Sequence, residues 1–121
     1  MKRTYQPEVK YGSPNLESVT PRILIGKRSD IQDGEFTNVM VGGRQILLAN
    51  IHGSYFATGN ICTHEGAELH KGEIDDKEIA CPWHGAKWDL TTGQLIWFSE
   101  SLEPIKSYKV IVEDDALFIE I

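Results

Sequence analysis

The chain has 121 residues, of which 40% are hydrophobic and 25% are charged, and its formal net charge is −6. A chain of this length forms one domain around one core. Its acidity argues against nucleic acid as a partner, because phosphate binding requires clustered lysine and arginine. The acidic surface favours solubility, or docking against a basic patch on a partner protein.

The first residues contain prolines and glycine without apolar periodicity, and they predict an N-terminal extension at residues 1–20 ahead of one domain at residues 21–121. The extension lacks the apolar centre of a signal peptide, and no apolar run approaches the ~20 residues that span a bilayer. We therefore expect a cytoplasmic monomer that does not enter the membrane. In a reducing cytosol, Cys62 and Cys81 would be metal ligands or free thiols rather than a disulfide.

Short strands dominate the first half of the predicted domain. The segment "RILIGK", residues 22–27, is apolar and β-branched. Residues 35–60 then predict three strands joined by two tight turns, at Gly42-Gly43 and at His52-Gly53. Glycine suits these positions because it accepts the positive φ of the primed hairpin turns.

The last residues, "SYKVIVEDDALFIEI", predict a hairpin that turns at Asp114-Asp115. Four apolar positions of this hairpin are expected to point inward: Val110, Val112, Leu117 and Ile119. No long amphipathic helix is predicted anywhere. Strands at this spacing, with glycine and Asn/Asp turns, indicate an all-β antiparallel sandwich or barrel. The region from about 61 to 105 interrupts it as a small inserted subdomain of loops.

Two loops of this subdomain carry most of the chemistry-bearing residues. Cys62 and His64 form C-x-H, and sixteen intervening residues later Cys81 and His84 form C-x-x-H. In an extended chain residues i and i+2 point to the same side, so Cys62 and His64 can face one metal site. The tight C-x-x-H turn can bring its own pair together. Two thiolates and two imidazoles make a complete ligand set.

The order of these ligands distinguishes between metals. A Cys₂His₂ zinc finger usually groups both cysteines in one segment and both histidines in the other. Here each loop supplies one of each kind. That mixed arrangement fits two metals side by side, as in a binuclear iron–sulfur cluster with two histidines on one iron.

The segments "CTHEGAEL" and "CPWHGAKWDLTTGQ" resemble the two cluster-binding loops of the Rieske family, and the resemblance extends over roughly residues 22 to 121. It implies a Rieske-like β fold with one [2Fe–2S] cluster. It further implies that Cys62 and Cys81 bind the inner iron. His64 and His84 would bind the outer, solvent-facing iron.

Several further residues receive roles from this resemblance. Gly66 and Gly85 would let the loops turn and present backbone N–H groups to the sulfides, although both could also be ordinary turn glycines. Pro104 lies where the family has a proline-bearing loop that shields the cluster. His52 and His70 lack a cysteine at matching spacing and are interpreted as surface histidines.

Four non-ligand positions indicate the branch of the family. Quinol-oxidising members carry an extra cysteine in each loop, joined by a disulfide, where this chain has Ala67 and Trp83. They also carry a serine and a tyrosine that donate hydrogen bonds to sulfur, where this chain has Ala86 and Trp88. Such hydrogen bonds raise the midpoint potential. The sequence therefore predicts a potential near the low end of the Rieske range, roughly −150 mV.

These residues predict a soluble one-electron carrier that passes electrons from a flavin-dependent ferredoxin reductase to a terminal oxygenase. The chain is not expected to be an enzyme, because no second His/Asp/Glu set with suitable spacing is left for a catalytic iron. Two alternatives remain. One is an electron-transfer subunit of another oxidoreductase, such as a nitrite reductase, and the other is a structural zinc module.

Overall fold

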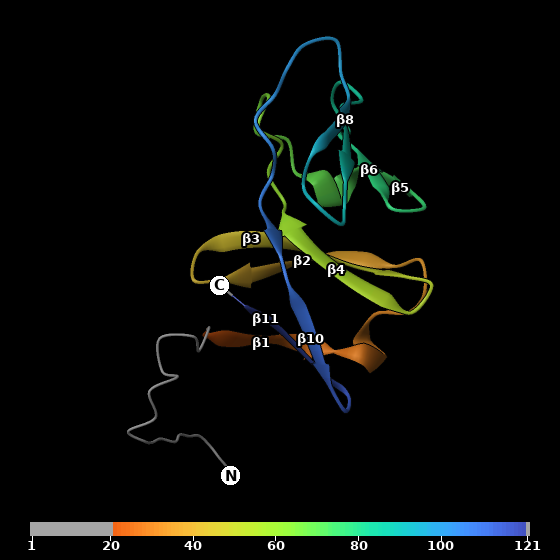
Figure 1. Cartoon of the computed structure of the whole chain (residues 1–121), viewed down its shortest axis with the longest axis vertical. Coiled ribbons are helices and arrows are strands. Elements are labelled where there is room, and N and C mark those ends of the chain that lie inside the picture. Colours follow the sequence, from red (N-terminus) through yellow and green to blue (C-terminus); the bar gives the residue numbers. More distant parts are fainter. Residues whose placement is uncertain (1–20, 121) are drawn as a thin grey trace.

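The computed structural model describes residues 21–120, so the expected extension at residues 1–20 lies outside the described residues. Three antiparallel sheets stand one above another along the molecule, with β5–β8 at one end and β1, β10 and β11 at the other (Figure 1). The first sheet contains, in spatial order, β1 (Arg22–Lys27), β11 (Ala116–Glu120) and β10 (Val110–Glu113). The second contains β2 (Phe36–Val41), β3 (Arg44–Ile51), β4 (Ser54–Gly59) and β9 (Ser107–Tyr108). The third contains β5 (Glu73–Asp75), β6 (Glu78–Ala80), β7 (Lys87–Asp89) and β8 (Leu95–Trp97). The predicted all-β antiparallel fold is confirmed.

Helical structure in the described chain is limited to two 3-10 turns, η2 (Arg28–Asp30) and η3 (Leu69–Lys71). Neither approaches the length of about 20 residues that a membrane-spanning helix requires. The described residues therefore include no helix that could cross a bilayer.

The predicted hairpin turns are confirmed. Val41 pairs with Arg44 and Ile51 pairs with Ser54, so each turn contains two residues. Gly42-Gly43 and His52-Gly53 have positive φ at both positions, as primed turns require. The last hairpin turns at Asp114-Asp115, because Glu113 pairs with Ala116.

One predicted core position in this last hairpin is wrong. Leu117 and Ile119 are fully buried and Val110 packs beside them, but Val112 is 43% exposed. Val112 lies opposite Leu117 on the same face of the sheet. However, β10 is an edge strand of that sheet and Val112 lies near its hairpin turn, so the Val112 side chain lies beyond the rim of the core.

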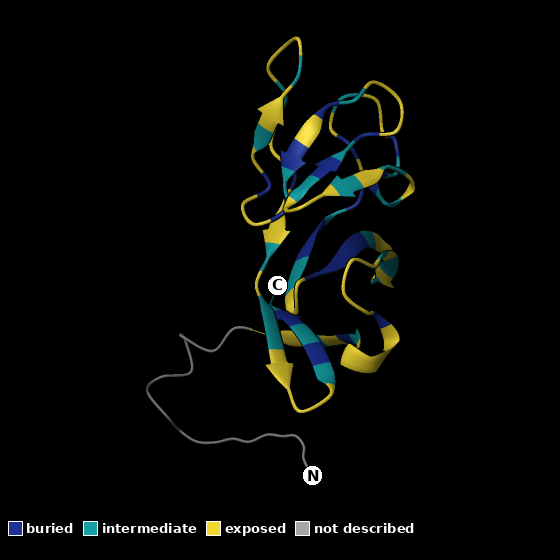
Figure 2. Ribbon diagram, turned by 90° about the vertical axis from the view of Figure 1, so that its right-hand side faces the viewer, coloured by how far each residue is buried: buried dark blue, intermediate teal, exposed yellow. Residues whose placement is uncertain are grey.

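Strand β3 separates two apolar cores. Its side chains alternate, so that Leu47, Ala49 and Ile51 pack into the core toward β5–β8, while Ile46 and Leu48 pack toward β1 and β11. A strand covered on both faces is apolar throughout rather than alternating. This explains the apolar run "ILLA" in the centre of β3. Figure 2 shows how buried segments of the strands alternate with exposed turns.

The sheet β5–β8 was not predicted, because the region was interpreted as loops. Each of its strands has only three residues. Such strands are too short to show the alternation by which strands are identified. The sheet buries Ile79 and Trp88 against the same core as the two cysteines, and it thereby supports the cysteine-bearing loops.

Candidate metal centre

The two cysteine-bearing loops, residues 62–67 and 81–86, close in the same way. In each, the cysteine N–H donates to the carbonyl of the alanine five residues later, and the glycine N–H donates back to the cysteine carbonyl. The distances are 2.8 Å for Cys62 to Ala67, 3.0 Å for Gly66 to Cys62, 2.8 Å for Cys81 to Ala86 and 3.1 Å for Gly85 to Cys81. Two segments of different sequence therefore present their cysteines on equivalent turns.

The glycines of these loops are required by the backbone. Gly66 and Gly85 have φ of +81° and +77°, in the left-handed region that other residues adopt only with strain. Their own N–H groups close the turns. The N–H groups directed at the Cys62 thiol come instead from His64 and Glu65. The loop thus provides backbone donors at sulfur, as expected of a site that holds thiolates.

Cys62 and Cys81 lie together inside the core and do not form a disulfide. Burial raises the pKa of the Cys62 thiol, and the neighbouring Cys81 raises it further. The Cys62 thiol therefore favours the protonated form unless a cation is close. A metal ion would remove this penalty by binding the thiolates.

The two predicted histidine ligands lie side by side nearer the surface. The ring centroids of His64 and His84 are 5.3 Å apart with an interplanar angle of 70°. Their side chains are 22% and 47% exposed, whereas both cysteines are buried. The structure therefore gathers two sulfur ligands inside and two imidazoles outside.

Glu65 is a site residue that was not predicted from the sequence. Its Oε1 accepts a hydrogen bond from Nε2 of His84 at 2.9 Å, and its Oε2 lies 3.8 Å from Nε2 of His64. The hydrogen bond from His84 lowers the pKa of the Glu65 carboxyl, so the group is charged at neutral pH. Its position directly after His64 was the only signal in the sequence.

Aromatic side chains extend from the histidines to the surface. The Phe98 ring lies 4.9 Å from the His64 ring, and Trp97 contacts Phe98 edge-on at 6.3 Å. Trp97 and Trp83 are both more than half exposed. Large apolar side chains at the surface are common where another protein binds.

The loop that contains Pro104 is attached to the first cysteine-bearing loop. Thr63 Oγ1 donates a hydrogen bond of 2.7 Å to the carbonyl of Glu103, next to the exposed Pro104. Ile105 is buried in the core with the cysteines. The proline-bearing loop therefore lies beside the candidate centre.

Trp88 provides a test of whether these residues suit a bound cofactor. Its indole ring is fully buried in the core that contains both cysteines, and its Nε1 has no hydrogen-bond partner among the described residues. A buried N–H without an acceptor is uncommon in a native interior. Together with two buried thiols and two clustered imidazoles, this unsatisfied interior fits a centre that a bound cofactor completes.

The remaining histidines have other roles. His70 bonds to Asn60 through both its backbone N–H and its ring Nδ1, at 2.8 Å each. His52 is exposed in its hairpin turn near Asp33. Neither belongs to the cluster of metal-binding groups formed by His64, Glu65 and His84. His52 is a surface histidine as predicted, whereas His70 is partly buried and hydrogen-bonded.

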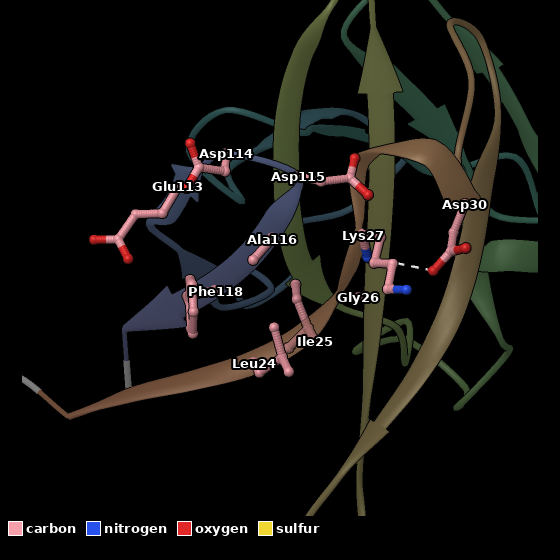
Figure 3. A pocket seen from close by; sticks show the side chains of 10 residues that line it. All are labelled: Leu24, Ile25, Gly26, Lys27, Asp30, Glu113, Asp114, Asp115, Ala116 and Phe118. Atoms are coloured by element: carbon pink, nitrogen blue, oxygen red, sulfur yellow. Dashed lines mark hydrogen bonds between the residues drawn. The ribbon is translucent and has the colours of Figure 1, made fainter. Parts of the chain in front are cut away.

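A hollow of about 690 Å³ lies elsewhere on the described surface, between β1 and the turn of the last hairpin (Figure 3). Leu24 and Phe118 form its apolar part, and Asp114 and Asp115 lie on its rim. None of the predicted ligands lines it. This hollow is therefore separate from the candidate centre.

A small antiparallel β fold with two equivalent Cys/His loops fits the class of iron–sulfur proteins that combine sulfur and nitrogen ligands. The family model of the Rieske [2Fe-2S] domain matches residues 22–109, and the chain belongs to this family. A [2Fe–2S] cluster is accordingly its cofactor.

Individual relatives are ferredoxins. The chain is 33% identical over 93 residues to the ferredoxin component of the naphthalene 1,2-dioxygenase system of Pseudomonas putida, covering 77% of this chain and 88% of that protein. The Sphingomonas yanoikuyae B1 ferredoxin superimposes with a TM-score of 0.76 at 32% identity over 84% of this chain and 99% of that one. A chain from the complex of reduced oxygenase and oxidized ferredoxin in carbazole 1,9a-dioxygenase superimposes with a TM-score of 0.74 at 27% identity, over 82% of this chain and 92% of that one.

Proposed function

We propose that Cys62 and Cys81 bind the inner iron of the [2Fe–2S] cluster and that His64 and His84 bind the outer iron. The observation that carries this assignment is the pair of equivalent loops, which bury both thiols and leave both imidazoles nearer the solvent. When bound, the cluster takes up and releases one electron at a time.

The residues of the chain perform three tasks in this proposal. The buried core around Cys62 and Cys81 excludes water from the sulfur side of the centre. The backbone N–H groups of His64 and Glu65 stabilise negative charge on the Cys62 sulfur. The imidazole of His84, which is more exposed than that of His64, provides a path between the centre and a docked partner.

The chain acts as an electron carrier rather than as an enzyme, and we propose that it accepts electrons from a flavin-dependent ferredoxin reductase and delivers them to a terminal oxygenase. Two findings support the oxygenase as acceptor. A relative is the ferredoxin component of a dioxygenase system, and a structural neighbour comes from an oxygenase–ferredoxin complex. The exposed Trp83 and Trp97 near the histidines supply an apolar surface for such a partner.

We further propose a midpoint potential near the low end of the Rieske range, roughly −150 mV. Ala86 has no side-chain hydrogen-bond donor, and Ala67 and Trp83 exclude the disulfide of the quinol-oxidising branch. A low potential suits electrons that come from a reductase. A fixed electron-transfer subunit of another oxidoreductase is the second candidate, because it would use the same four ligands.

The domain organisation is part of the proposal. Residues 61–105 would form the cluster-binding subdomain of a Rieske domain at residues 21–121. The separate sheet β5–β8 and the core that it shares with the two cysteines support this division.

Metal analysis and spectroscopy of the purified chain test the ligand assignment. We expect two irons and two acid-labile sulfides per chain, and a midpoint potential close to −150 mV by spectroelectrochemistry. Replacing Cys62, Cys81, His64 or His84 with alanine should each abolish the cluster. The control His52→Ala, at an exposed histidine outside the centre, should leave it intact. Colourless protein with stoichiometric zinc would contradict the proposal.

A further inference from the structure

We propose that Glu65 is a positioning residue for both outer histidines, and that its charge lowers the midpoint potential of the centre. The inference rests on the proposed function, because it takes His64 and His84 as ligands of the outer iron. It assigns the carboxylate two separate effects: orientation of the imidazole rings through hydrogen bonds, and electrostatic destabilisation of the reduced state.

The geometry places one carboxylate between two rings. Oε1 of Glu65 is 2.9 Å from Nε2 of His84, which is a hydrogen bond, and Oε2 is 3.8 Å from Nε2 of His64. The two carboxylate oxygens of Glu65 therefore face different histidines, and these histidines come from different loops. Glu65 connects the C-x-H loop to the C-x-x-H loop on their outer side.

The chemistry of imidazole gives this contact a consequence. A carboxylate only accepts hydrogen bonds, so the ring nitrogen that faces it must carry the proton. For His84 that nitrogen is Nε2, which leaves the lone pair of Nδ1 for a metal. Histidines that bind metals commonly donate their second ring N–H to a carboxylate, and this contact fixes the tautomer and the ring orientation. Glu65 selects the same state before the metal binds.

The charge acts in addition to the hydrogen bond. Reduction adds one negative charge to the centre, and a fixed negative charge next to its histidines opposes that step. The Glu65 side chain is half exposed, so water screens the interaction. We expect the charge to lower the equilibrium constant for reduction by about threefold to tenfold. For one electron, at 59 mV per tenfold, this lowers the midpoint potential by about 28–59 mV.

The variant Glu65→Gln tests this role, because glutamine keeps an acceptor oxygen and removes the charge. The matched control is Glu103→Gln, which removes one charge from the neighbouring loop, where Glu103 contacts Thr63 only through its backbone carbonyl. Midpoint potentials of both variants and of the unaltered protein are measured by spectroelectrochemistry at one pH and ionic strength. We expect Glu65→Gln to raise the equilibrium constant for reduction threefold to tenfold. Glu103→Gln should change the same constant less than twofold. Equal shifts in both variants, or no shift in either, would overturn the inference.

The variant Glu65→Ala tests the orienting effect separately. It removes the acceptor as well as the charge, so the visible absorption of the cluster should decay several-fold faster than in Glu65→Gln during aerobic incubation. Equal decay rates would show that the hydrogen bond does not position the rings.

A crystal structure of the unaltered, cluster-loaded protein provides a test that needs no variant to fold. A Glu65 oxygen within 3.5 Å of Nε2 of His84 is expected, and a carboxylate turned away from both rings would overturn the role. These results are distinguishable from failure of the proposed function. Absence of iron and sulfide from the unaltered protein contradicts the ligand assignment, whereas a normal cluster with an unmoved potential contradicts only the role of Glu65.

Discussion

Asp89, the last residue of β7, uses its carboxylate to close the turn that leads into β8. Oδ1 accepts hydrogen bonds from the backbone N–H of Thr91 at 2.8 Å and from its hydroxyl at 2.6 Å. These contacts lower the pKa of the Asp89 carboxyl below its ordinary value of 3.8. The charged form is therefore favoured more in the folded protein than in the unfolded chain.

Asp89→Asn should destabilise the protein at pH 7 by about 0.5–1 kcal/mol, because a neutral amide accepts these hydrogen bonds more weakly. A depressed native pKa contributes stability above the unfolded pKa and loses it as the pH falls through the native value. The difference in the free energy of unfolding between the variant and the unaltered protein should therefore be constant above about pH 5 and shrink below pH 4. Urea unfolding of both at each pH measures it, since acid effects common to both cancel. A difference that grows toward low pH would contradict the assignment.

At the scale of the elements, Gly93 connects the β7–β8 turn to the proline-bearing loop. Ile105 donates its N–H to the carbonyl of Gly93 at 2.9 Å. A Cβ at Gly93 would lie 2.0 Å from the carbonyl oxygen of Ile105, and φ of Gly93 is +80°. The loop can lie against the turn only because this residue has no side chain.

Gly93→Ala should destabilise the protein by about 2–5 kcal/mol, which combines about 1–2 kcal/mol for the left-handed backbone with about 1–3 kcal/mol for the steric conflict. Gly43→Ala is the matched control, because Gly43 has nearly the same φ of +82° but a Cβ added there would meet no atom within 4 Å. It should cost only about 1–2 kcal/mol. Chemical denaturation of the two variants compares them, and equal losses would show that the backbone contact with Ile105 is unimportant.

At the scale of the whole molecule, the two cores differ in what holds them together. The core between β3 and the neighbouring strands β1 and β11 is built from strands of five to eight residues. The core under β5–β8 uses three-residue strands and contains both cysteines. Short strands provide few backbone hydrogen bonds, so under the proposed ligand assignment this end depends more on the metal centre that would link its two loops.

Removal of the cluster should therefore loosen one end of the molecule selectively. Hydrogen exchange followed by mass spectrometry should show at least roughly tenfold faster exchange in residues 61–105 of the metal-free protein, with little change in β2–β4. Local stability that differs between regions of one fold is the physical basis of this expectation. A uniform increase along the chain would instead show a single cooperative unit and would contradict the proposed subdomain.

The sequence was sufficient wherever the determining interactions are local. The two-residue turns at Gly42-Gly43 and Asp114-Asp115 follow from backbone preferences of the residues within them. The Rieske family, predicted from the cysteines, histidines and glycines of the two loops, is confirmed.

Only the tertiary structure decided the features that depend on distant segments. Val112 is exposed because its strand lies at an edge, and the strands β5–β8 exist because four short segments pair with one another. Glu65 can have its proposed role only because a loop nineteen residues further along the chain places His84 beside it. Sequence by itself determined the family and predicted the ligand types, because these depend on local patterns. Folding determined which other groups touch the proposed ligands, because such contacts depend on packing between segments that no local pattern describes.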